Sequence, residues 1–199
     1  MKTYNFEQLS EEWYAIRRGI PTASNFDKII TSKGEPSKQR TKYMYRLAGE
    51  AVSGIQEETY QNAAMIRGIE LEEEARDLYE VLNDTEVEQV GFCLEDAIVK
   101  AGASPDGIIN DFGMLEIKCP LITTHVDYLL KGKLPTEYFQ QVQGQLYITG
   151  SDWCDFMSYF PGLKPLIIRV GREEDFINKL EDALVVFCKE LNKIIIKIK

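Results

Sequence analysis

The sequence contains no long run of apolar residues, and no stretch approaches the ~20 residues that a membrane-spanning helix needs. Its first residues, MKTYNFEQLSEEW, carry acidic side chains where a secretion signal needs an apolar segment. We therefore expect a protein of the cytoplasm. We expect no membrane partner.

Cysteine and histidine are scarce. There is no CxxC pair, the only histidine is His125, and the four cysteines are Cys93, Cys119, Cys154 and Cys188. This pattern gives no support to a zinc or iron–sulfur site, and we expect free thiols. His125 follows the Pro120-Leu121 turn, and we expect it to be a loop side chain.

The composition is that of one globular domain spanning residues 1–199. Hydrophobic residues make up 44% and charged residues 28% of the chain, whose net charge is −9. Residues 1–50 hold nine Lys and Arg against six Asp and Glu, whereas residues 51–100 hold three against thirteen. A carboxylate-rich site for divalent cations beside a cationic surface for phosphate fits this asymmetry, and so does an acidic helix that faces solvent.

Hydrophobic periodicity predicts helices, then a mixed sheet, then helices, which indicates an α/β fold with a central mixed β-sheet flanked by helices. The helices are expected at about Phe6–Arg18, Asn25–Thr31, Thr41–Val52, Tyr60–Leu82, Thr136–Tyr147 and from Glu173 to beyond Leu191. The strands are expected at 90–94, 97–109, 113–120, Cys154–Tyr159 and Pro165–Val170.

The most informative segment places Asp106 nine residues before Glu116-Ile117-Lys118. Strand alternation puts Glu116 and Lys118 on one face, which we expect to be the wetter one, and a hairpin returns Asp106 beside Glu116. Two carboxylates can bind Mg²⁺, and a nearby lysine can orient or deprotonate an attacking water. The alternative is a surface cross-strand pair next to a simple turn.

Three other features are compatible with a site, although each has an ordinary structural explanation. Glu72 can point from a helix toward the sheet, and the face that carries Gln141 and Gln145 could hold a water or a phosphate oxygen. Arg17 at a helix end, followed by Ser24 at the start of the next helix, could bind an anion. The ordinary explanations are a solvated acidic helix, surface glutamines and helix capping.

Together these segments resemble the lambda exonuclease family, also described as YqaJ-like phage recombinase nucleases, of the PD-(D/E)xK nuclease superfamily. The resemblance covers roughly residues 10–160 and rests on four blocks in family order: WYAIRRGIPTAS, RGIELEEEARDLYE, AGASPDGIINDFGMLEIKCP and EYFQQVQGQLYITG. It implies a PD-(D/E)xK (restriction-endonuclease-like) core.

The resemblance also implies a role for particular residues. Asp106, Glu116 and the carbonyl of Ile117 would bind Mg²⁺, with Mn²⁺ as a substitute. Lys118 would be the catalytic lysine. The remaining roles would fall to the helix-borne carboxylate Glu72, the water- or phosphate-positioning Gln141, and Arg17 and Ser24, which would hold a terminal 5′-phosphate.

The function implied by the resemblance is a Mg²⁺-dependent 5′→3′ exonuclease that degrades one strand at double-stranded DNA ends and leaves 3′ overhangs for recombination. Relatives of this kind form ring trimers and work with a single-strand annealing protein. Two alternatives remain open: a structure-specific or restriction-type endonuclease on the same core, and a catalytically inactive DNA-binding module. An iron–sulfur nuclease is disfavoured by the cysteine spacing.

Overall fold

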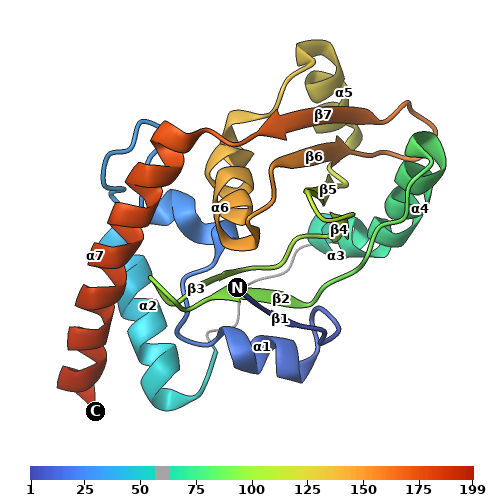
Figure 1. Cartoon of the computed structure of the whole chain (residues 1–199). Helices are drawn as coiled ribbons and strands as arrows, with labels where there is room; N and C mark the ends of the chain where they lie inside the picture. Colours follow the sequence, from blue (N-terminus) through green and yellow to red (C-terminus); the bar gives the residue numbers. More distant parts are fainter. Residues whose placement is uncertain (57–62) are drawn as a thin grey trace.

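The structure, a computed structural model, describes residues 1–56 and 63–199 (Figure 1). Its described helices are α1 (Glu11–Arg17), η1 (Ala23–Lys28), α2 (Arg40–Ser53), α3 (Ala63–Glu70), α4 (Glu72–Asn83), α5 (Ile122–Lys131), η2 (Thr136–Tyr138), α6 (Phe139–Thr149) and α7 (Glu174–Ile198). Its described strands are β1 (Lys2–Tyr4), β2 (Phe92–Glu95), β3 (Ala101–Ala103), β4 (Gly107–Ile109), β5 (Gly113–Lys118), β6 (Trp153–Ser158) and β7 (Leu166–Gly171).

The strands form two sheets where the sequence predicted one. Three antiparallel strands lie in the order β1-β2-β3, and a mixed sheet has the order β4-β5-β6-β7. Only the β5–β6 pair among these is parallel. A parallel pair needs a long crossover connection, and here α5 and α6 provide it. The predicted α/β class with a mixed sheet and flanking helices is confirmed (Figure 1).

The strand predicted over residues 97–109 is in fact two strands, one in each sheet. β3 ends at Ala103 and β4 starts at Gly107, so Ser104, Pro105 and Asp106 carry the chain from one sheet to the other. Proline has no backbone N–H for a ladder and fixes its own φ. After this crossing, the Asp106 N–H donates to the Leu115 carbonyl at 3.1 Å and starts the β4–β5 hairpin.

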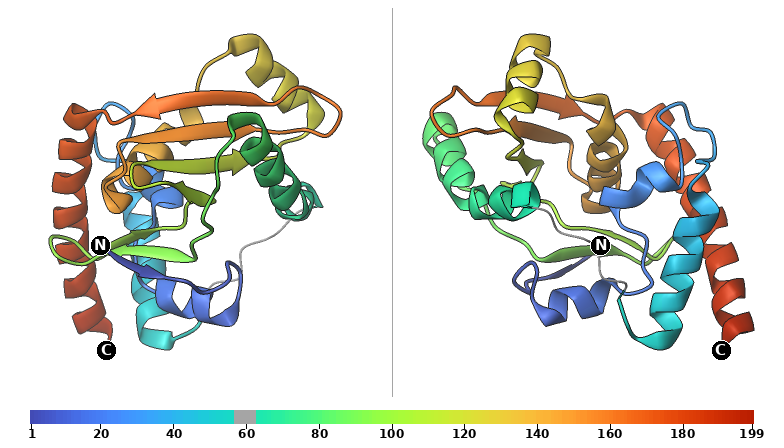
Figure 2. Two further views of the ribbon diagram at one scale, coloured as in Figure 1. Left: turned by 45° about the vertical axis from the view of Figure 1, so that its right-hand side comes forward. Right: turned by 180° about the vertical axis from the view of Figure 1, so that it is seen from behind.

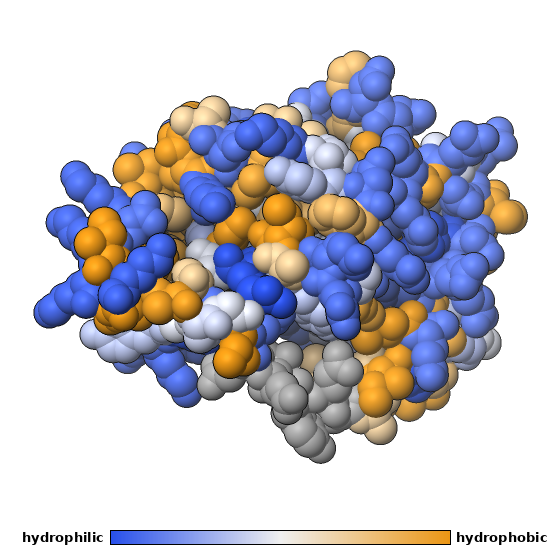
Figure 3. Space-filling view, turned by 90° about the horizontal axis from the view of Figure 1, so that it is seen from below, coloured by the Kyte–Doolittle hydropathy of each residue, from blue (hydrophilic) through white to orange (hydrophobic). Residues whose placement is uncertain are grey.

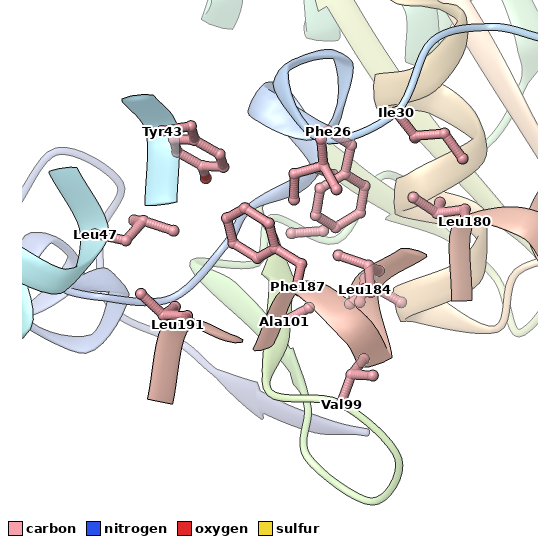
Figure 4. Close-up of a cluster of buried hydrophobic side chains, with 14 of the residues drawn as sticks. Phe26, Ile30, Tyr43, Leu47, Val99, Ala101, Leu180, Leu184, Phe187 and Leu191 are labelled. Atoms are coloured by element: carbon pink, nitrogen blue, oxygen red, sulfur yellow. The ribbon is translucent and has the colours of Figure 1, made fainter. Parts of the chain in front are cut away.

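The main hydrophobic core lies where α2, η1 and α7 meet the three-stranded sheet. Phe26, Tyr43, Leu184 and Phe187 are almost completely buried there, and Ala101 of β3 packs beneath them (Figure 4). α7 and α2 lie side by side in both views of Figure 2. The predicted C-terminal helix is confirmed, because an apolar residue every three or four positions gives α7 a continuous stripe facing this core.

Two predictions of helices need correction. The first helix begins at Glu11 rather than Phe6, after Leu9 takes a positive φ of 69°. The helix predicted over Tyr60–Leu82 is interrupted at Leu71, and its first residues lie outside the described part of the chain.

Helix α5 was not predicted at all, so the expectation that His125 is a loop side chain is wrong. His125 lies on α5 and is fully buried. Its Nδ1 is 2.8 Å from Ser158 Oγ, and its Nε2 donates to the Lys164 carbonyl at 3.1 Å. The only histidine therefore joins α5 to β6 and to the loop that precedes β7.

Polar side chains cover most of the face seen from below, with apolar groups scattered between them (Figure 3). Single exposed apolar residues are normal on protein surfaces. No helix in the described part of the chain is both long enough and apolar enough to span a membrane.

A buried polar contact fixes α4 against the mixed sheet. The Tyr79 hydroxyl on α4 donates to Asp155 Oδ2 on β6 at 2.7 Å, and Arg169 on β7 donates to both carboxylate oxygens at 2.9 Å. Asp155 is 2% exposed, so these donors stabilise a charge that has almost no contact with water. Burial and the Asp155 carboxylate raise the pKa of Tyr79.

Tyr79→Phe is expected to lower the free energy of unfolding by about 1–3 kcal/mol, because the buried Asp155 carboxylate loses a donor but keeps Arg169. Urea unfolding measures the change. Tyr45→Phe is the matched control, since Tyr45 is 61% exposed. Equal unfolding free energies for the two variants would show that the Tyr79 hydroxyl does not hold α4 in place.

Candidate active site

A small pocket of about 160 Å³ lies beside the Ser104–Asp106 crossing. It brings together six of the eight residues that the sequence and the resemblance single out: Arg17, Ser24, Asp106, Glu116, Lys118 and Gln141. The other residues that line it are Gln8, Trp13, Thr22, Ala23, Ser104 and Gln145. The pocket thus unites the candidate metal ligands with the candidate phosphate-binding residues.

Glu72 lies in an adjoining cavity of about 490 Å³, and Gln8 and Asp106 line both spaces. Glu72 is the first residue of α4. Burial raises the pKa of Glu72, Lys118 opposes this rise, and the Glu116 carboxylate adds to it. Glu72 therefore belongs to the same electrostatic cluster as Glu116 and Lys118.

Glu116 is the most buried member of the cluster, at 1% exposed. Its Oε1 accepts from Gln141 Nε2 at 2.5 Å and from Lys118 Nζ, and its Oε2 accepts from Gln145 Nε2 at 2.7 Å. The expectation that Glu116 occupies a wet face is wrong, because α6 packs over that face of β5. The predicted glutamine face of this helix contacts the carboxylate directly.

Asp106 lies next to Glu116 because the hairpin pairs β4 with β5. Its Oδ2 accepts from the Ile117 N–H at 2.6 Å, so the third predicted ligand position, Ile117, is joined to it through the backbone. Burial and then the Glu116 charge raise the pKa of Asp106 well above its usual value, and Lys118 offsets only part of this. Repulsion between the carboxylates therefore favours binding of a further cation.

Lys118 is an ammonium in this cluster. Burial lowers its pKa, but the Glu116 and Asp106 carboxylates raise it by more, and the net pKa lies above the ordinary value. Its Nζ lies 5.4 Å from the centre of the Tyr138 ring. Lys118 can therefore orient a water or donate a proton here, but it cannot accept one while it contacts Glu116.

The donor set fits a hard divalent cation, because carboxylate and carbonyl oxygens are the ligands that Mg²⁺ and Mn²⁺ prefer. In the described part of the chain no three His, Cys, Asp or Glu side chains are already grouped around a cation position, and Lys118 contacts Glu116. Gln145 Oε1 is buried without a hydrogen-bond partner beside this carboxylate. A water or a hydrated ion would supply the missing donor.

Arg17 also lines the pocket. Its guanidinium stacks 3.9 Å from the centre of the Trp13 ring, and Nη1 donates to Ser104 Oγ at 2.8 Å. Trp13 Nε1 donates to the Gly91 carbonyl and to Ser104 Oγ, which fixes both side chains. Burial lowers the pKa of Arg17 to about 10. Among the described residues no carboxylate pairs with this cation, which suits it to an anionic ligand.

Ser24 lies near the start of η1, where the sequence left helix capping as an alternative. Thr22, at the N-cap position, makes no side-chain capping bond. Its hydroxyl lies 3.4 Å from Ser24 Oγ, and Asn25 Nδ2 donates to both hydroxyls. The exposed Ser24 hydroxyl lines the pocket together with Arg17.

Sequence reasoning missed Gln8 and did not assign Ser104. Gln8 precedes α1, and its Nε2 donates to the Val90 and Pro105 carbonyls. These contacts join segments far apart in the chain, so no local sequence pattern could predict them. Ser104 could have been found, because it opens the Ser104-Pro105-Asp106-Gly107 segment that drew attention to Asp106.

A family model described as the YqaJ-like viral recombinase domain matches residues 12–152. This match covers most of the chain and every pocket residue except Gln8. The chain belongs to the YqaJ-like viral recombinase family.

The relatives of this recombinase domain include solved structures. It resembles an alkaline exonuclease, LHK-Exo, from Laribacter hongkongensis, with 37% identity, coverage of 95% of this chain and 96% of that one, and a TM-score of 0.87. LHK-Exo in complex with dAMP matches at 38% identity, 96% coverage of each chain and the same TM-score. The chain is thus a nuclease domain of the YqaJ-like family.

Two further proteins are similar to this chain at lower sequence identity. A phage-related exonuclease from Haemophilus somnus 129PT shares the fold at 17% identity and a TM-score of 0.73, over 90% of this chain and 96% of that one. Protein R354 of Acanthamoeba polyphaga mimivirus is 30% identical over 171 residues, 78% of this chain. The chain spans about 30% of the length of that curated relative.

Proposed function

We propose that this chain, as a single nuclease domain, is a metal-dependent exonuclease that degrades one strand of duplex DNA from its 5′ end and leaves a 3′ overhang for recombination. One observation carries the proposal: a single pocket of about 160 Å³ is lined by the carboxylate–lysine cluster and by Arg17, which pairs with no carboxylate of the described residues. The family and the likeness to LHK-Exo supply the reaction class.

Asp106, Glu116 and the Ile117 carbonyl would hold the metal, with Glu72 beside them. Mg²⁺ is the expected ion, and Mn²⁺ its substitute. A bound divalent ion would supply an activated water and neutralise charge on the phosphoryl group. Gln141 and Gln145 hold the Glu116 carboxylate in position, so its two oxygens keep a fixed orientation.

The remaining side chains act on the nucleotide and on protons. Once a metal shares the charge of Glu116, Lys118 is available to orient the attacking water or to protonate the leaving oxygen. Arg17 and Ser24 would grip the terminal 5′-phosphate, with a charge-assisted hydrogen bond from the guanidinium. Because Arg17 and Ser24 line the same pocket as the carboxylates, a substrate whose terminal phosphate they hold would have a phosphodiester near Asp106 and Glu116.

The test compares substrates with and without ends. Linear duplex should release nucleotides when Mg²⁺ is added, whereas a covalently closed circular duplex should stay intact. Cutting of the closed circle would favour an endonuclease, and no release from linear DNA at any metal concentration would favour an inactive DNA-binding module. A ring trimer acting with a single-strand annealing protein in the host cytoplasm belongs to the same proposal, and light scattering tests the trimer.

The terminal-phosphate grip predicts a preference for 5′-phosphorylated ends. Such duplexes should be cut faster than 5′-hydroxyl duplexes by roughly 10- to 150-fold, because a charge-assisted arginine contact contributes about 1.5–3 kcal/mol. Arg17→Ala should remove most of this preference and barely change the slow cutting of 5′-hydroxyl ends. Initial rates on both end types, at one salt concentration, measure it.

Arg18→Ala is the matched control, because Arg18 is the neighbouring arginine but is exposed and does not line the pocket. This variant should keep the preference for 5′-phosphate. Equal rates of wild type on 5′-phosphate and 5′-hydroxyl ends, or an equal slowing of both substrates by Arg17→Ala, would show that Arg17 does not bind the terminal phosphate.

A further inference from the structure

Another cavity, of about 250 Å³, lies next to the active-site pocket and is lined by residues that the proposed reaction does not use. Its lining residues are Lys28, Gln39, Lys42, Tyr43 and Arg46. Residues of η1 contribute to both spaces, Ser24 to the active-site pocket and Lys28 to this cavity. We call it the basic cavity.

A hydrogen bond joins the two spaces directly. The backbone N–H of Thr22, which lines the active-site pocket, donates to the Tyr43 hydroxyl at 3.2 Å. Tyr43 projects from α2 into the space between α2 and the segment that carries Phe26 (Figure 4). Ser24 and Lys28 are four residues apart on η1, a separation of roughly 8 Å at the rise of a 3₁₀ helix.

The basic cavity has an excess of positive charge. Lys28 Nζ lies 5.7 Å and the Arg46 guanidinium 5.1 Å from the centre of the same Tyr43 ring. None of the lining residues is acidic. Among the described residues, Asp27 acts on Lys28, and a Glu50 carboxylate oxygen lies 3.8 Å from Arg46 Nε.

One hydrogen-bond donor of the Arg46 guanidinium has no acceptor in this arrangement. Its Nε is buried and has no hydrogen-bond partner, because the contact with Glu50 is too long for a hydrogen bond. Burial and the Arg46 charge both lower the pKa of Lys28, so the two cations repel each other as the protein stands. An anion between them would relieve the repulsion and supply an acceptor.

We propose that Lys28, Lys42 and Arg46 form a second phosphate site, which holds the backbone of the DNA substrate beside the terminal-phosphate grip. The proposal rests on the proposed nuclease function. A guanidinium and two ammonium groups present only hydrogen-bond donors, and the Gln39 amide can add an N–H donor. Such a set suits phosphodiester oxygens, and contacts to the phosphate backbone carry no base specificity. The site brings together three of the nine Lys and Arg residues of the segment 1–50.

The experiment measures binding of linear duplex DNA in metal-free buffer, where no cleavage occurs, over a range of salt concentrations. The double variant Lys28→Gln/Lys42→Gln should bind about 5- to 10-fold more weakly per lost phosphate contact at 0.1 M salt. The slope of log K against log salt should fall by about one for each contact. Cleavage per bound complex, at saturating DNA and Mg²⁺, should stay close to wild type.

Lys189→Gln/Lys193→Gln is the matched control, because it removes the same charge from exposed positions on α7. This control should keep the wild-type slope. If the Lys28 change disturbs η1, the single variant Lys42→Gln, at an exposed position, should still reduce the slope by about one. Thermal melting reveals such a disturbance.

The outcomes separate the two proposals. A wild-type slope in the double variant, or an equal loss in the control, would overturn the second phosphate site while leaving the nuclease intact. Inorganic phosphate at constant ionic strength should displace DNA more readily from wild type than from the double variant, and equal displacement from both proteins would also overturn the second phosphate site. A wild-type protein that binds linear duplex but never cleaves it would instead overturn the proposed function.

Discussion

Replacing Asp106 with asparagine is expected to slow DNA cleavage by about a thousandfold or more without loosening the fold. The amide can no longer contribute an anionic oxygen to a divalent cation, and losing one preorganised electrostatic group of this kind has effects on the order of 10³. Asparagine keeps an oxygen that can accept from the Ile117 N–H, so the hairpin should persist. Single-turnover cleavage at saturating Mg²⁺ measures the loss.

The same variant should be at least as stable as wild type without metal. The folded-state pKa of Asp106 is raised by burial and by Glu116, so its ionised form opposes folding. This contribution lowers stability as pH rises from the unfolded value of about 3.9 through the raised folded value. A neutral amide removes it, and the melting temperature in chelator should stay level or rise.

Mg²⁺ provides a readout that does not depend on activity. A ligand that binds only the folded protein raises its stability, so Mg²⁺ should raise the melting temperature of wild type and have little effect on Asp106→Asn. Asp111→Asn, at an exposed position in the adjacent turn, is the control and should behave as wild type. Near-normal cleavage by Asp106→Asn would remove this carboxylate from the catalytic site.

Lys118→Ala is expected to lose about 10²–10⁴ in the chemical step, which is the usual contribution of a positioned proton-transfer group. It should also be less stable in metal-free buffer, because the buried Glu116 carboxylate keeps its two glutamine donors but loses the Lys118 cation. Mg²⁺ should stabilise this variant more than wild type, since the metal no longer competes with the ammonium for Glu116.

Lys118→Arg separates chemistry from charge balance. A guanidinium restores the positive charge but is bulkier and does not exchange its proton in this pH range, so cleavage should remain low while stability recovers. Lys131→Ala, an exposed lysine paired with Asp127 on α5, controls for the loss of a surface charge. Close to full cleavage by Lys118→Arg would reduce Lys118 to a counter-ion.

The convergence of Asp106, Glu116 and Lys118 could be predicted because it depends on local rules. Strand alternation fixes the face that Glu116 and Lys118 share, and the turn after Ile109 returns the chain beside Asp106. Helical spacing likewise placed Gln141 and Gln145 together. These contacts need only the period of one strand or one helix.

The burial of the site could not be predicted, because it depends on what packs over each element. Alternation alone cannot show that α6 covers the face of β5 that carries Glu116, so that face was expected to be wet. The same limit applies to His125, whose partners Ser158 and Lys164 come from later in the chain. The burial of such positions depends on tertiary packing, which the periodicity of a single strand or helix does not reveal.

The crossing between the two sheets also has a mechanical consequence. Ser104 holds Arg17 through its hydroxyl, and Asp106 holds Ile117 through its carboxylate, with only Pro105 between them. Two residues of chain span at most about 7 Å, and the ring of proline stiffens that span further. This short span and the two hydrogen bonds together limit how far the Arg17 guanidinium can move from the carboxylates.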